Sequence, residues 1–106
     1  CIRDSSYTPV DSGLPFATDV EQDGAQITLS AMAQAWGISP VQTGMGGSIP
    51  FIADLKENFP DAQILVTGVE DPDTRAHSAN ESLYVPDFKR GILAEALILS
   101  ALSRSK

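Results

Sequence analysis

The segment from Thr74 to Glu81 reads Thr-Arg-Ala-His-Ser-Ala-Asn-Glu and holds His77, the one histidine in a chain of 106 residues. An imidazole can bind a metal ion or exchange a proton near neutral pH. Oxygen ligands could come from the nearby carboxylates of Glu70, Asp71, Asp73 and Glu81. A lone loop histidine is more often an exposed or hydrogen-bonded residue, and an acidic loop is most often solvated surface. The residues alone therefore leave both interpretations open.

Complete catalytic or metal sites of familiar types are excluded by the residue inventory. The chain has no second histidine, and its one cysteine is Cys1. A closed zinc site with three or four nitrogen and sulfur ligands therefore cannot form within it. No Gly-x-Ser-x-Gly turn is present to support a Ser-His-Asp triad. We expect no catalytic residue in this segment.

A second unusual segment, Gly-Met-Gly-Gly-Ser-Ile-Pro at residues 44–50, precedes a predicted helix. Ser48 is placed to cap that helix, with Pro50 in its first turn. The free backbone amides of such a helix end can receive an oxyanion or a carboxylate. The plainer alternative is a tight turn that needs glycine for its dihedral angles. Spacing alone favours the turn, and the segment matches no Walker or dinucleotide-binding motif.

Hydrophobic spacing predicts three helices that would carry and flank these loops. The first covers residues 23–37 and stops at a glycine, and the second covers 51–59 and ends before Pro60. The third has an amphipathic stripe over residues 88–102, with Asp87 placed to cap its first turn.

Strands are expected at residues 40–43, 62–67 and 81–85, and residues 62–67 are apolar enough for a strand buried on both faces of a parallel sheet. The alternation of strands and helices predicts an α/β fold, with layers of helices on parallel strands. Both unusual loops follow a predicted strand, so we expect them to face one site at the carboxyl edge of the sheet. Residues 1–17 read as a lead-in segment and residues 18–106 as the domain itself.

Composition limits the partners and the compartment. Fourteen acidic residues against seven basic ones give a net charge of −7, which disfavours binding to nucleic acid or to an anionic membrane surface. The longest apolar stretch, residues 92–102, is too short to cross a bilayer. A single cysteine rules out an internal disulfide and fits a reducing cytoplasm best. The chain opens without methionine, so we expect a piece of a longer protein.

Taken together, the two loops carry a specific resemblance. Gly-Gly-Ser-Ile-Pro at residues 46–50, Gly-Val-Glu-Asp at 68–71 and Ala-His-Ser-Ala-Asn-Glu at 76–81 occur in this order before a long helix. Over residues 14–104 the chain resembles the carboxyl-terminal part of the dizinc metallopeptidases that include aminoacylases, acetylornithine deacetylase, succinyl-diaminopimelate desuccinylase and dipeptidases. The Gly-Gly-Ser-Ile-Pro and Gly-Val-Glu-Asp-Pro runs look most like the dipeptidase members.

The resemblance implies roles for both loops. His77 corresponds to a zinc ligand, and Asn80 or Glu81 would orient it from a second layer of contacts. The residues expected to lie against the substrate are Gly46, Gly47 and Ser48. Two zinc ions would share a bridging water and lower its pKa for attack on a peptide or acyl-amide carbonyl. The residues present leave open whether the substrate is a dipeptide, an N-acyl amino acid or a succinylated amine.

The resemblance also marks what is not here. The family's His-x-Asp motif, bridging aspartate and Glu-Glu pair are absent, as is its dimer-forming lid domain apart from a candidate last strand in residues 1–9. We therefore expect a segment that needs the amino-terminal half of its own catalytic domain, dimerises through the lid, and is inactive in isolation. The alternatives are a freestanding small α/β module that binds an anion or ligand without catalysis, and a relative that kept the fold and lost its metals.

Overall fold

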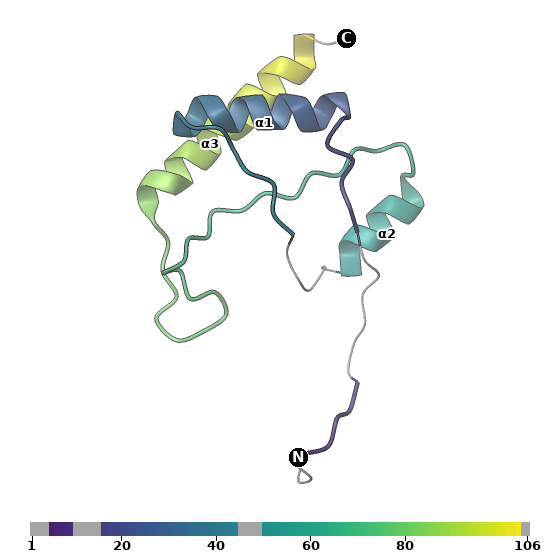
Figure 1. Cartoon of the computed structure of the whole chain (residues 1–106), viewed down its shortest axis with the longest axis vertical. Coiled ribbons are helices and arrows are strands. Elements are labelled where there is room, and N and C mark those ends of the chain that lie inside the picture. Colours follow the sequence, from purple (N-terminus) through teal and green to yellow (C-terminus); the bar gives the residue numbers. More distant parts are fainter. Residues whose placement is uncertain (1–4, 10–15, 45–49, 105–106) are drawn as a thin grey trace.

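A computed structural model describes residues 5–9, 16–44 and 50–104, and within these ranges it contains three helices and no strand (Figure 1). The helices are α1 (Asp23–Trp36), α2 (Pro50–Asn58) and α3 (Val85–Arg104). The three predicted helices are therefore confirmed. The predicted α/β/α layering with parallel strands is wrong for the part of the chain that the structure describes.

Helix α1 ends where the sequence predicts. Gly37 adopts φ 75°, a left-handed conformation that glycine accepts without a steric penalty, and its N–H donates to the carbonyl of Ala33 at 2.9 Å. At the other end, the N–H of Gly24 donates to Oε1 of Gln63 at 2.7 Å. A side chain 39 residues further along the chain thus satisfies one of the free amides in the first turn.

Helices α2 and α3 form where the spacing predicts, with boundaries shifted by one to three residues. Helix α2 begins at Pro50 and ends at Asn58, two residues before Pro60. Helix α3 already begins at Val85, because the carbonyl of Tyr84 accepts the N–H groups of both Asp87 and Phe88. The strand predicted for residues 81–85 is therefore wrong. The carboxylate of Asp87 lies in the first turn and pairs with Arg90 at 2.7 Å.

Helices α1 and α3 pack against each other and cross in Figure 1. The buried residues of the two helices are small, which lets two backbones approach closely: Gly24, Ala25, Thr28 and Ala31 on α1, and Ala94 on α3. The hydroxyl of Thr28 is satisfied within its own helix by the carbonyl of Gly24 at 2.9 Å. Among the described residues, α2 packs on neither of the other helices.

The segments predicted as strands at residues 40–43 and 62–67 are extended but not paired. Among the described residues, three long-range hydrogen bonds hold segment 62–67. Gln63 Oε1 accepts the N–H of Gly24 on α1, the carbonyl of Ile64 accepts Thr18 Oγ1 at 3.1 Å, and Thr67 Oγ1 donates to Glu95 on α3 at 3.4 Å. Val66 is 60% exposed. A parallel strand needs neighbours on both sides to satisfy its backbone groups. None of the described segments takes that place, which is the physical reason that the sheet prediction fails.

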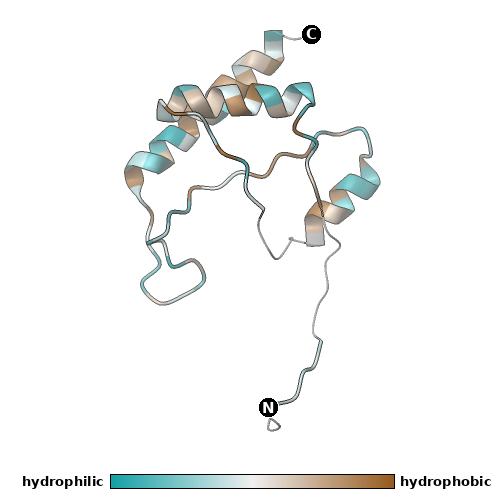
Figure 2. Cartoon of the chain, viewed as in Figure 1, coloured by the Kyte–Doolittle hydropathy of each residue, from teal (hydrophilic) through white to brown (hydrophobic). Residues whose placement is uncertain are grey.

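The chain leaves an unusual amount of surface in contact with solvent. A compact protein of 11.3 kDa exposes about 5,700 Å², whereas this chain exposes 8857 Å². Its radius of gyration is 17.3 Å, against about 13 Å for a compact domain of this length. Figure 2 shows apolar residues along the extended segments as well as at the helix crossing. None of the three described helices has both the length and the apolar character that crossing a bilayer requires.

Candidate functional site

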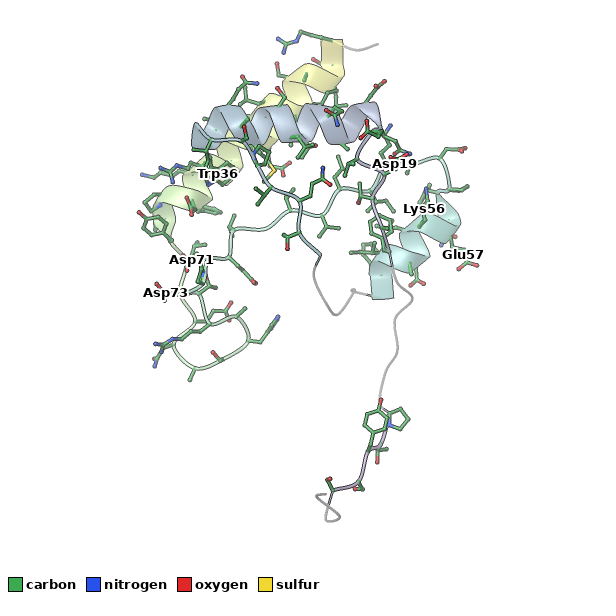
Figure 3. The ribbon with its side chains drawn as sticks, viewed as in Figure 1. Asp19, Trp36, Lys56, Glu57, Asp71 and Asp73 are labelled. Carbon is green, nitrogen blue, oxygen red and sulfur yellow. The ribbon has the colours of Figure 1, made fainter. Side chains whose placement is uncertain are left out.

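The histidine lies in a closed polar loop, residues 71–82, which we call the histidine loop. It leaves the extended segment after Glu70 and returns to the chain just before α3, and it hangs away from the helix pair (Figure 1). Asp71 and Asp73 lie at its base (Figure 3). Among the residues from 71 to 82, Thr74 is buried, Asp71 and Ala76 are half-buried, and the others are exposed.

Hydrogen bonds close the base of this loop. The N–H of Asp71 donates to Oγ1 of Thr74 at 2.9 Å, and the N–H of Thr74 returns a bond to the carbonyl of Asp71 at 3.1 Å. The carbonyl of Thr74 in turn accepts the N–H of Ser82 at 3.0 Å. The N–H of Asp73 donates to the carboxylate of Asp71 at 2.7 Å. Residues 75–81 thus form an excursion, a stretch of loop whose two ends are joined by the hydrogen bond between Thr74 and Ser82.

Within the excursion the backbone is held in a conformation that non-glycine residues rarely adopt. Arg75, His77 and Asn80 have φ values of 55°, 61° and 60°. Each left-handed residue of this kind costs on the order of 1–3 kcal/mol and persists where surrounding contacts determine it. Here the carbonyl of Arg75 accepts two bonds from Ser78, from its N–H at 3.1 Å and from its hydroxyl at 2.6 Å.

His77 is exposed, and among the described residues it forms a hydrogen bond through its backbone and not through its ring. The N–H of His77 donates to Oε2 of Glu81 at 3.3 Å. Glu81 therefore holds the main chain at His77 instead of the imidazole itself. Asn80 shapes the loop through its left-handed backbone conformation, since its side chain makes no hydrogen bond to the described residues.

The histidine loop fits one ligand of a metal site but not a whole site. The imidazole of His77 is solvent-facing and has no hydrogen-bonding partner among the described residues, so its nitrogens are free to bind a metal. Within residues 5–9, 16–44 and 50–104, no group of three histidine, cysteine or carboxylate side chains is close enough to hold an ion. Further ligands would have to come from elsewhere.

The predicted substrate-binding residues, Gly46, Gly47 and Ser48, lie outside the described residues. Pro50, two residues after Ser48, is the first residue of α2. The prediction that the glycine segment and the histidine loop face one site stays a prediction.

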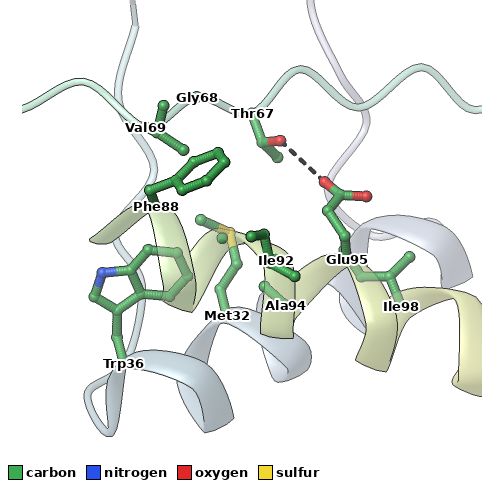
Figure 4. Close-up of a pocket in the computed structure, with 11 residues that line it drawn as sticks. Met32, Trp36, Thr67, Gly68, Val69, Phe88, Ile92, Ala94, Glu95 and Ile98 are labelled. Carbon is green, nitrogen blue, oxygen red and sulfur yellow. Dashed lines mark hydrogen bonds between the residues drawn. The ribbon is translucent and has the colours of Figure 1, made fainter. Parts of the chain in front are cut away.

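An apolar pocket that the sequence did not predict as a site lies where α1, α3 and residues 67–69 meet (Figure 4). Its volume is about 420 Å³, and Met32, Trp36 and Phe88 form much of its wall. One carboxylate, Glu95, lies at its margin and accepts a bond from the hydroxyl of Thr67 at 3.4 Å. Helical spacing of Met32 and Trp36 predicts packing residues, and both are half-buried here. The pocket is lined for apolar contact and holds no group suited to acid–base or metal chemistry beyond that carboxylate.

Comparison with known proteins identifies a relative. The chain is 34% identical over 86 residues to a cysteinylglycine-S-conjugate dipeptidase of Corynebacterium striatum. The match includes 80% of this chain and 19% of the relative, so the chain spans about a fifth of the relative's length. No protein-family model matches the chain, and no solved structure matches it significantly. The chain is thus related to a dipeptidase-type peptidase.

Proposed function

We propose that these residues are the carboxyl-terminal segment of the catalytic domain of a zinc-dependent hydrolase that cleaves small peptides. The observation that carries the proposal is the similarity to a dipeptidase over 86 residues, a stretch that includes 80% of the chain. The motif around His77 and the presentation of its ring to solvent add support from within the chain. The relative's name favours a dipeptide over an N-acyl amino acid as the substrate.

The exposed surface supports an incomplete domain over a freestanding module. The excess over a compact chain is about 3,100 Å² on this chain alone, more than the roughly 1,000–2,500 Å² that each partner of an obligate interface buries. The extended segment 62–67 also pairs with no described strand, so its backbone is available to further strands. An amino-terminal half of the same domain would supply both the strands and the remaining metal ligands.

In this proposal the chain's own residues bind and orient. His77 would hold one zinc ion, in the main-chain conformation that Glu81 stabilises. Zinc bound in such a site lowers the pKa of its water and polarises a carbonyl. Gly46, Gly47 and Ser48 would hold one end of the peptide so that the scissile carbonyl is correctly placed. No general base is assigned to this chain.

The test is made on the complete product of the gene that encodes this segment. Hydrolysis of cysteinylglycine and of an N-acetyl amino acid is measured, together with the zinc content of the purified protein. We expect cleavage of the dipeptide and zinc in the wild type, and loss of both in His77→Ala. Lys89→Gln, an exposed change on α3, is the matched control. Retention of both zinc and activity by His77→Ala would rule out the proposal.

Residues 1–106 on their own give a second test. Because the described residues hold one free imidazole and no cluster of three ligands, we expect this segment neither to bind zinc tightly nor to hydrolyse dipeptides. Calorimetry that showed submicromolar zinc affinity for the segment would contradict the claim that the site is shared with another part of the protein.

A further inference from the structure

Thr74 is a buried residue in a loop that is otherwise largely exposed. It is 4% exposed, although most of the histidine loop is in contact with solvent. A buried hydroxyl is retained at a position only where its hydrogen bond is satisfied. The hydroxyl of Thr74 accepts the N–H of Asp71 at 2.9 Å, and no buried side-chain polar atom of the described residues is left without a partner.

The bonds of Thr74 connect three points of the loop. Its hydroxyl and N–H both bind Asp71, at the start of the loop, and its carbonyl accepts the N–H of Ser82, at the end of the loop. His77 lies in the exposed excursion between these ends. The left-handed backbone at Arg75, His77 and Asn80 needs such closure, because an open loop of these residues would return to the common regions of φ.

We infer that Thr74 is a positioning residue for His77: its buried hydroxyl holds the turn at residues 71–74, from which the Thr74 carbonyl binds Ser82 and closes the base of the histidine loop, and this closure determines how tightly His77 holds a zinc ion. The inference rests on the proposed role of His77 as a zinc ligand. Thr74 is buried and is assigned no contact with metal or substrate; it acts through the backbone of residues 75–81. Outer contacts of this kind change metal affinity by about 10–100-fold in known sites.

The experiment compares isosteric variants in the complete gene product. Thr74→Val keeps the volume and removes the hydroxyl, whereas Thr74→Ser keeps the hydroxyl. Thr28→Val is the matched control, since Thr28 is 6% exposed, carries a satisfied hydroxyl and lies on α1, outside the loop. Zinc affinity is measured by competition with a chelator. Loop closure is measured independently as the rate of tryptic cleavage after Arg75.

We expect Thr74→Val to weaken zinc binding about tenfold and to speed cleavage after Arg75. Thr74→Ser and Thr28→Val are expected to remain within about twofold of the wild type in both measurements. If His77→Ala weakens zinc binding but Thr74→Val does not, the inference is overturned while the proposed function stands. If His77→Ala leaves zinc binding unchanged, the proposed function fails, and the inference about zinc fails with it.

Discussion

The α1–α3 pair and the histidine loop owe their order to different forces. The helices meet around small buried residues such as Ala31 and Ala94, whose methyl side chains cannot bind a metal. The loop has a single buried residue and is shaped by hydrogen bonds at Thr74 and Glu81. Apolar packing is broad and tolerant of position, whereas hydrogen bonds are directional. His77, the residue proposed to bind a metal, therefore lies where directional hydrogen bonds determine the backbone conformation.

This contrast predicts that the two regions can be damaged separately. Changes in the loop should alter zinc binding and catalysis with little effect on stability. Changes in the helix pair should do the opposite. The four predictions that follow test this separation in the complete gene product, from the largest expected effect to the smallest.

Replacement of His77 by alanine should have the largest effect. We expect kcat/KM for dipeptide hydrolysis to fall by more than about 100-fold, because a direct metal ligand matters more than the outer contacts worth 10–100-fold. Since His77 is exposed, the thermal unfolding midpoint of the metal-free protein should not change. A large drop in that midpoint would show that the loop also contributes to the fold, and would break the contrast.

Ala94→Leu should reverse this pattern. Ala94 is 5% exposed at the crossing of α1 and α3, and a larger side chain there should destabilise the protein by about 1–3 kcal/mol. Denaturant unfolding measures the change, and zinc affinity should be unaffected. The same substitution at the exposed Ala96 of the same helix is the control, expected within about 0.5 kcal/mol of the wild type. Equal effects at both positions would argue against the observed helix contact.

Gln63→Ala tests the long-range contact at the start of α1. Loss of the bond from the N–H of Gly24 should destabilise the protein by about 1 kcal/mol, as for other lost helix caps. Gln34→Ala, on the exposed face of α1, should change the free energy of unfolding by less than about 0.5 kcal/mol. If both glutamine variants unfold alike, segment 62–67 does not stabilise the helix in solution.

Substitution of Asn80 should have the smallest effect and distinguishes two roles. If Asn80 matters for its left-handed backbone, Asn80→Ala should weaken zinc binding about fivefold, equivalent to about 1 kcal/mol, while Asn80→Gly should bind zinc as the wild type does. If the amide side chain orients His77, as the resemblance implies, both variants should weaken zinc binding equally. Chelator competition separates the two outcomes.

The helices were predictable because their signals are local. The spacing of apolar residues, the stop at Gly37 and the break before Pro60 act within one or two turns, and the structure agrees at each. The sheet was not predictable from residues 62–67, because an apolar run says that a segment can be a strand but not that partners are present. The strand predicted for residues 81–85 is wrong because the N–H groups of Asp87 and Phe88 bind the carbonyl of Tyr84 and start a helix at Val85.

The candidate site divides in the same way. The sequence by itself determined that the chain's one histidine lies in a polar loop before a long helix, since residue type and local spacing are sufficient for that. Only the tertiary structure decided that Thr74 is buried, that Glu81 accepts the main-chain N–H of His77, and that Gln63 reaches the first turn of α1. These are contacts between groups whose approach depends on the whole path of the chain, and no local pattern of residues specifies that path.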